Sequence, residues 1–287
     1  MLVAVAAMGF VACQSEFDEP NVNQPMADEV VVRFVADEPA TRTAVDTSSD
    51  EAPVFSWSDS ESFAVLEQTD GLAVGANVSY EKVDGKANIT ATFVKNEGKS
   101  EYKYVTVYPA EGYVSAESID AATLALPANQ TMAAGSYDPN ADLMVSKVVT
   151  TAAQPTEAQQ VEFTRLVAVV KMTLKNFNLE AGDEVEKVVF MADGKALAGT
   201  ITADLNAPHE FEVADGVSSV SVITNASDAI YFNVLPTTLE AGDTYTIVVV
   251  TNKKLYVKEG TIPEGKALTL EAGMVNRFGV NMMGVMG

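Results

Sequence analysis

The segment Glu29-Val-Val-Val-Arg-Phe-Val35 has the pattern of a strand that is buried on one face, with Val30, Val32 and Phe34 on that face. Similar short runs, rich in Val, Ile, Thr, Tyr and Phe, recur along the chain, and turn pairs such as Asp-Gly separate them. They cover 62–66, 87–94, 102–108, 166–174, 185–191, 217–223, 229–235, 245–251 and 275–282. Only 115–122 has the pattern of a short helix. The sequence therefore predicts an all-β protein built from β-sandwiches.

The length and charge of the chain bound the classes of protein to which it can belong. Its 287 residues are 47% apolar, which is enough for two domains that each bury a core. We place the domain boundary in the polar segment 150–160, so that the predicted β-sandwiches cover 29–152 and 153–287. The 40 acidic and 18 basic residues give a net charge of -22, which argues against nucleic-acid binding because that function needs a basic surface.

The N-terminal segment is typical of a bacterial lipoprotein precursor. The only cysteine, Cys13, follows an apolar run and precedes a polar stretch that contains two prolines. We expect 1–12 to be a lipoprotein signal peptide, Cys13 to carry the lipid, and 13–28 to be a tether between lipid and fold. No Lys or Arg precedes Arg33, which indicates that the signal peptide begins further upstream. The alternative is a buried cysteine in a short N-terminal strand or helix.

Residues that could support catalysis or bind a metal ion are few. His209 is the one histidine, so a Ser-His-Asp triad would depend on it, and no cluster of His and Cys has zinc spacing. Asp138, Asn140 and Asp142 alternate as in a calcium-binding loop, although the loop lacks its glycine and its final glutamate. The segment 260–266 fits the phosphate-binding pattern G-x-x-x-x-G-K, but a glycine-bounded hairpin turn accounts for it better. We therefore expect no enzyme, no cofactor and no metal, with a structural calcium site as the open alternative.

Four segments of the chain follow one another in an order and at a spacing that point to a family. They are Ala40-Thr-Arg-Thr43 with the tryptophan-containing run 54–65, Leu126-Pro-Ala-Asn-Gln-Thr131 with 135–145, Phe163-Thr-Arg-Leu-Val-Ala168, and Tyr231-Phe-Asn-Val-Leu-Pro236. Together they resemble the fimbrillins of Bacteroidetes, the lipoprotein-derived subunits of type V pili. The resemblance covers nearly all of the chain after Cys13, and Ser60-Glu61 stands where that family often has Gly-Asp.

The resemblance implies two tandem transthyretin-like β-sandwich domains and a structural subunit of a surface fimbria that contributes to adhesion. It implies a lipid-anchored outer-membrane precursor, exposed on the cell surface, and a mature form in the fimbria. In that family an arginine-specific or trypsin-like protease removes the first strand together with the lipid, and a strand of another subunit fills the groove. The implied partners are other fimbrial subunits, the outer membrane through the lipid, and a host or bacterial surface ligand.

Two arginines are candidates for the processing site. Arg42 is preferred because it follows Pro39 in a predicted loop, where proteolytic nicking concentrates, whereas Arg33 lies inside the predicted first strand. A cut after Arg42 would release the strand that carries Val30, Val32 and Phe34, and each of these side chains contributes about 2 kcal/mol when buried.

The C-terminal strand is the candidate donor. Phe278, Val280 and Met282 alternate there with polar or small residues, although a strand that only completes its own domain would show the same pattern. Stalk, tip and anchor subunits are not separated by these features. A surface glycan-binding β-sandwich lipoprotein is the main rival, although Trp57 is the only tryptophan, and a β-sandwich hydrolase comes third.

Overall fold

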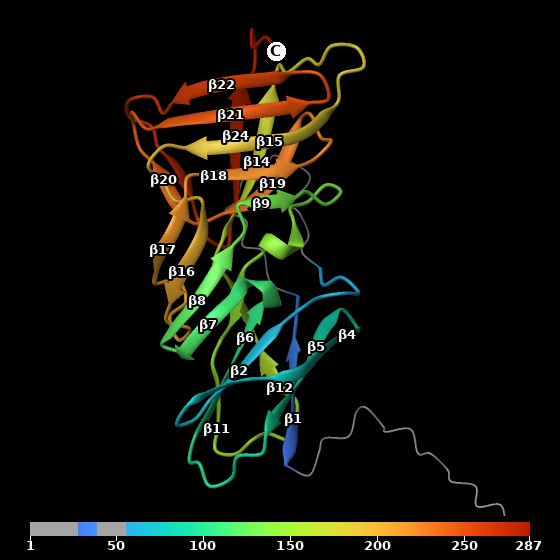
Figure 1. Cartoon of the computed structure of the whole chain (residues 1–287), viewed down its shortest axis with the longest axis vertical. Helices are drawn as coiled ribbons and strands as arrows, with labels where there is room; N and C mark the ends of the chain where they lie inside the picture. Colours follow the sequence, from blue (N-terminus) through green and yellow to red (C-terminus); the bar gives the residue numbers. More distant parts are fainter. Residues whose placement is uncertain (1–27, 39–55) are drawn as a thin grey trace, which may run out of the picture.

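The computed structural model of the chain describes residues 28–38 and 56–287, and in this part nearly all regular structure is strand (Figure 1). The predicted all-β class is confirmed. The segment 115–122, expected to be helical, instead contributes to the hairpin of β7 (Tyr113–Ser118) and β8 (Ala121–Leu126), because alternate side chains of β8 enter the core. No helix within the described residues is long and apolar enough to cross a bilayer.

The N-terminal half is built on two sheets that pack face to face. The first has the order β12-β1-β5-β4. Its strands are β1 (Glu29–Ala36), β4 (Ala76–Val83), β5 (Lys86–Val94) and β12 (Gln159–Val161). The second has the order β13-β10-β6-β2-β3, and β11 also pairs with β6. Its strands are β2 (Ala64–Gln68), β3 (Leu72–Val74), β6 (Tyr102–Tyr108), β10 (Met144–Ser146), β11 (Val149–Thr151) and β13 (Phe163–Arg165).

The second sheet is a central layer that is covered on both faces. Phe63, Val65 and Tyr104 join the core that faces β1, whereas Leu66 and Val105 join the core shared with β8. In β6, six of the seven residues are buried, and Lys103 is the half-buried exception, as expected of a strand covered on both faces. The layer on the far side is a four-stranded sheet of order β17-β16-β8-β7.

The C-terminal half contains the remaining sheets. A five-stranded sheet has the order β22-β21-β15-β18-β9, and a three-stranded sheet has the order β19-β14-β24. The five-stranded sheet contains β9 (Asn129–Thr131), β15 (Val185–Ala192), β18 (Ser219–Ile223), β21 (Thr244–Thr251) and β22 (Leu255–Thr261). The other strands are β14 (Ala168–Lys175), β16 (Ala198–Ala203), β17 (Phe211–Val217), β19 (Ala229–Val234), β20 (Thr237–Leu239), β23 (Leu268–Leu270) and β24 (Val275–Asn281).

The two halves of the chain exchange strands. From the N-terminal half, β8 pairs with β16 and β9 pairs with β18, while β12 and β13 pair with β1 and β10. Two short 3-10 helices, η1 (Ala110–Gly112) and η2 (Pro139–Ala141), lie near the junction. The boundary between 152 and 153 stays a prediction, and the strand pairing does not follow it.

Candidate functional site

The first strand, β1, lies in the interior of its sheet although it begins the described fold. It pairs antiparallel with β5 along all eight of its residues and parallel with β12 along three. Neighbouring strands are about 4.8 Å apart, so β5 and β12 are separated by the width of one strand. Loss of β1 would therefore leave a slot that one strand can fill.

One face of β1 is built into the core. The relative exposure is 0% for Val32, 1% for Phe34 and 0% for Ala36, while Val30 is half-buried at the edge of the same cluster. The ring of Phe34 lies 5.7 Å from that of Tyr104 on the central sheet. The three residues predicted to share a face, Val30, Val32 and Phe34, do so, and their displacement stays a prediction.

The side chain of Trp57 closes the C-terminal end of β1. Its indole Nε1–H donates to the carbonyl oxygen of Asp37 at 3.2 Å, and the side chain is fully buried. The ring packs against Phe63 and Tyr108 at centroid distances of 5.6 and 5.4 Å. Lys86 adds an ion pair to the Asp37 carboxylate at 2.8 Å. The chain leaving β1 is thus attached to the sheet by a part-buried hydrogen bond and an exposed ion pair.

A cavity of about 840 Å³ begins where β1 ends. Asp37 and Glu38 line it together with the edge strands β12 and β13 and the loop that precedes β24. Lys147 on its wall pairs with Glu162 at 2.5 Å, and His209 lies exposed beside it. The lining mixes charged and apolar side chains, and the hydrogen bonds of the described residues place no nucleophile and base around His209.

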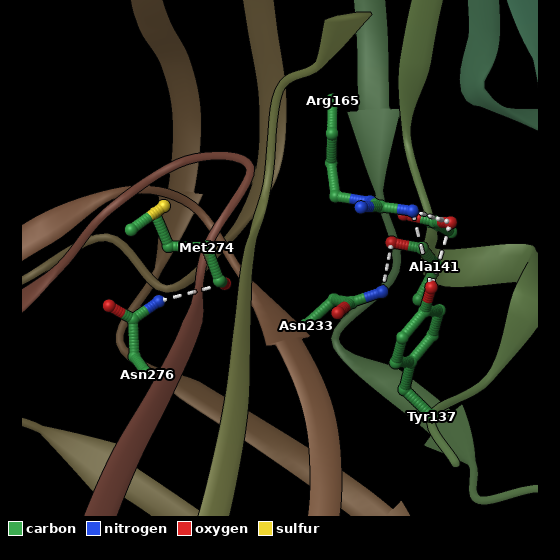
Figure 2. Close-up of polar contacts among 7 residues, drawn as sticks. Tyr137, Ala141, Arg165, Asn233, Met274 and Asn276 are labelled. Atoms are coloured by element: carbon green, nitrogen blue, oxygen red, sulfur yellow. Dashed lines mark hydrogen bonds and ion pairs between the residues drawn. The ribbon is translucent and has the colours of Figure 1, made fainter. Parts of the chain in front are cut away.

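One residue of the cavity wall, Arg165, belongs to a buried ion pair. Arg165 Nε and Nη2 donate to the two carboxylate oxygens of Asp142 at 2.5 and 2.9 Å, and the side-chain exposures are 3% and 0%. Tyr137 Oη donates to Asp142 at 3.1 Å, and Figure 2 shows its hydroxyl directed toward this pair. Burial lowers the pKa of Arg165, but the charge and hydrogen bonds of Asp142 outweigh it and leave the pKa above its usual value. Arg165 is therefore a fixed buried cation.

The alternating residues 138–142 serve the fold, which argues against the calcium alternative. Both Asp142 oxygens accept from Arg165, and the Asp138 carboxylate accepts from the backbone N–H groups of Thr131 and Asn140 at 2.8 and 2.9 Å. Asp138 thereby caps η2. The described residues contain no cluster of three His, Cys, Asp or Glu residues that could hold a metal ion.

Gln130 and Asn233 connect the same region to the C-terminal half. Gln130 Nε2 donates to the Asn233 carbonyl oxygen at 2.7 Å, and the Asn233 backbone N–H donates to Gln130 Oε1 at 2.9 Å. Asn233 Nδ2 donates in turn to the Ala141 carbonyl oxygen at 3.0 Å (Figure 2). On the other side of this view, Asn276 Nδ2 donates to the Met274 carbonyl oxygen at 3.2 Å and holds the loop that lines the cavity.

The other predicted residues lie elsewhere. Cys13 and Arg42 are outside the described residues, and Arg33 is exposed on the outer face of β1. Phe278, Val280 and Met282 belong to β24 and the loop after it, and β24 runs parallel to β14 along seven residues. Figure 1 shows β24 in the half of the molecule opposite to β1, and the two strands contribute to different core clusters.

Sequence reasoning missed the polar network of this site, which comprises Gln130, Tyr137, Asp142, Arg165 and Asn233. All five residues fall within the segments on which the family resemblance was based. The sequence did contain a signal for this network, because charged and amide residues stand inside apolar segments. Such residues are expected to be buried, and buried polar groups need hydrogen-bond partners.

Comparison with known proteins bears on the fold. No protein-family model matches the chain, and no curated protein matches it. Among solved structures, a crystal structure from Bacteroides uniformis, described as a "putative cell adhesion protein", superimposes with a TM-score of 0.52 and 15% identity over 92% of this chain and 96% of that one. Another with the same description, from Bacteroides fragilis, has a TM-score of 0.51 and 11% identity over 87% and 92% of the two chains. At these identities the likeness establishes a shared fold.

Proposed function

We propose that this chain is a fimbrillin-type structural subunit of a bacterial surface fimbria, that it contributes to adhesion, and that it is not an enzyme. The four sequence segments support this assignment, and so does a fold shared with two proteins whose descriptions refer to cell adhesion. The observation that carries the proposal is the position of β1, because the first strand of the fold fills a slot between β5 and β12.

Assembly would proceed by replacement of β1. The precursor is anchored to the outer membrane through lipid on Cys13 and faces the outside of the cell, and a protease cuts after Arg42. The released strand leaves backbone groups of β5 and β12 unpaired, and each buried unpaired group costs about 1–3 kcal/mol. A strand of another subunit restores these bonds by β-strand addition. Its sequence needs apolar residues at alternate positions to replace Val32, Phe34 and Ala36.

The register of β1 favours Arg42 over Arg33 as the processing site. Arg33 is paired with Thr90 in the middle of the ladder between β1 and β5. A protease binds its substrate as an unpaired extended chain, so a cut at Arg33 would require β1 to leave first. Cleavage beyond the end of the strand requires no such opening.

The C-terminal strand stays a candidate donor. In the folded chain Val280 and Met282 are buried, and Phe278 packs against Phe190 and Tyr245 at 5.8 and 5.1 Å. To act as a donor, β24 would have to leave β14 in its own subunit. A stalk subunit loses β1 and an anchor subunit keeps it, so the digestion experiment below separates these two roles.

The glycan-binding alternative is less favoured. A carbohydrate platform needs exposed aromatic rings, but Trp57 is fully buried and no Phe, Tyr or Trp of the described residues is among the largely exposed apolar side chains. A surface ligand of another kind is compatible with the proposed adhesive role.

Limited digestion with trypsin tests the assignment. We expect a new N-terminus at Thr43, with loss of the segment that contains β1, and oligomers that resist denaturation and appear in electron micrographs only after digestion. Arg42→Ala should prevent the cut and the oligomers, whereas the control Arg33→Ala should leave both. A digested chain that keeps β1 and stays monomeric would contradict a stalk role and indicate an anchor or tip subunit.

Metabolic labelling with palmitate tests the anchor. Wild type should incorporate label and fractionate with the outer membrane, and Cys13→Ala should do neither. An unlabelled wild-type chain would refute lipidation without affecting the strand-replacement proposal.

A further inference from the structure

The outer face of the five-stranded sheet in the C-terminal half is unusually apolar. Cross-strand partners in it are Val189 with Val248, Val248 with Val257, and Val250 with Leu255. Directly paired side chains on one face lie about 5 Å apart, so these residues are contiguous. With Met191 and Ile223 they form a patch that we call the β21 face, whose apolar members are Val189, Met191, Ile223, Val248, Val250, Leu255 and Val257.

This face is open to solvent. Ile223, Leu255 and Val257 are 56%, 58% and 49% exposed, and the other members are half-buried. From the spacing of strands and residues, the patch covers about 300 Å². Apolar patches of this size on a soluble protein are often functional.

The corresponding outer face near β1 is different. There Arg33 pairs with Thr90, Thr90 pairs with Ser79, and Asn88 pairs with Glu81. A polar outer face is the ordinary choice for a sheet whose other face is buried. The β21 face therefore differs from the polar outer face near β1 in the same chain, and an exposed apolar face of this kind is suited to bind a partner.

The charges on the β21 face indicate which partner. On β15, Lys187 pairs with Val250 of β21. On β22, at the other side of β21, Glu259 pairs with Thr246. Val250 and Thr246 are each two residues from Val248 along β21, so Val248 lies midway between the two charges. Neither Lys187 nor Glu259 has an ion-pair partner within 28–38 and 56–287.

We propose that the β21 face docks onto the β21 face of a second copy of this chain, with a two-fold axis over Val248 and Lys187 of each copy against Glu259 of the other. A two-fold contact brings the same patch together from both subunits, so a neutral patch with opposite charges on either side of its centre is self-complementary. The net charge of -22 makes most other surfaces of two copies repel each other.

The contact is weak in isolation and effective when copies are held together. A stable interface buries about 800 Å² per partner, which is more than this patch supplies. Copies arrayed on a surface have a high local concentration, which compensates for a low affinity. Figure 1 shows the sheet of β21 at the end of the molecule opposite to β1, so the contact does not depend on the fate of β1.

Site-directed cross-linking tests the axis. Facing sheets pack about 10 Å apart, too far for a disulfide, so a short bismaleimide is the probe. In a Cys13→Ser background, Val248→Cys should cross-link to itself at least ten times faster than Val83→Cys, a control on β4 that is 42% exposed. Equal rates for the two variants would overturn the proposal.

Charge reversal tests the pairing. Added to Val248→Cys, Lys187→Glu should slow cross-linking at least fivefold, and Lys187→Glu with Glu259→Lys should restore the rate. A single reversal without effect, or a double reversal that fails to restore the rate, would overturn the two-fold arrangement. As an independent measure, sedimentation of the wild type should depend on concentration and that of Leu255→Asp should not. Monomeric wild type at every concentration would refute the docking.

Discussion

Arg165 and Asp142 form a pair of charges whose role is structural and not catalytic. The pair is bidentate and almost fully buried, and the Tyr137 hydroxyl donates to the same Asp142 oxygen that accepts from Arg165 Nη2. The attraction between the partners offsets much of the cost of removing each charge from water, so the pair is tolerated only while both are present. The pair also joins η2 to β13 and so positions the wall of the cavity next to β1.

Removal of one partner of this pair should be strongly destabilising. We expect Asp142→Asn to lower the free energy of unfolding by about 3–5 kcal/mol, because Arg165 is left as a buried charge without its counterion. Arg165→Met combined with Asp142→Asn should be less destabilising than the sum of the single changes. Urea denaturation followed by circular dichroism measures both, and strictly additive effects would show that the two groups do not interact.

Tyrosine ionisation should limit stability in alkali. A hydrogen bond to Asp183, together with burial, raises the pKa of Tyr256 to about 12, and burial with nearby Glu61 raises the pKa of Tyr80 to about 12. Burial also raises the pKa of Tyr104, Tyr108 and Tyr137. In the unfolded chain these groups ionise near pH 10.

The sign of this effect follows from linkage. The stabilising contribution is complete below pH 10 and is lost as the pH rises toward 12, because the unfolded state releases its protons first. Absorbance at 295 nm should therefore rise late and together with the loss of circular dichroism. Ionisation of most of the nine tyrosines at pH 10 in a chain that is still folded would contradict the expectation.

At the scale of the element, β1 is packed into the core, but within the described fold it is covalently joined to the other strands only through its C-terminal end. Val32, Phe34 and Ala36 on its core face are fully buried. The covalent connection from β1 to the rest of the sheet runs only through the chain after Asp37, so a cut there leaves β1 held by hydrogen bonds and packing alone. Trp57 lies at this exit and is the only tryptophan, so its fluorescence reports on whether β1 is in place.

Release of β1 should be governed by Phe34. After trypsin digestion, Phe34→Ala should release the strand at a lower urea concentration than wild type, because truncating a buried Phe costs about 3–5 kcal/mol. The emission of Trp57 should shift to longer wavelength in the same step, since the indole becomes hydrated. Arg33→Ala is the matched control, and an equal effect of the two changes would contradict the role of the buried face.

At the scale of the whole molecule, the halves of the chain form one packed body. One core cluster includes Leu66 and Val105 from the central sheet together with Leu166 and Phe232 from the C-terminal half. Exchange of β8, β9, β12 and β13 between the halves adds main-chain hydrogen bonds across the same region. Such sharing favours a single cooperative transition.

A fragment that ends at residue 152 should not fold. It would lack β12 and β13 and would expose the edges of β8 and β9 that pair with the C-terminal half. We expect poor dispersion of its amide proton resonances, whereas the full chain should unfold in one transition by calorimetry. A fragment 29–152 with native-like dispersion would show that the halves are independent.

The alternation of side chains was sufficient to predict the all-β class, the strand at Glu29 and its buried face, because which residues of a strand face the core follows from a local period of two. Which strand pairs with which does not follow from the local sequence of either strand. The pairing of Gln159–Val161 with β1, the passage of β8 and β9 into the C-terminal sheets, and the burial of Arg165 against Asp142 depend on contacts between segments far apart in the chain. Only tertiary packing decided these, since a strand pattern specifies a face to be buried but leaves open which edge completes its hydrogen bonds.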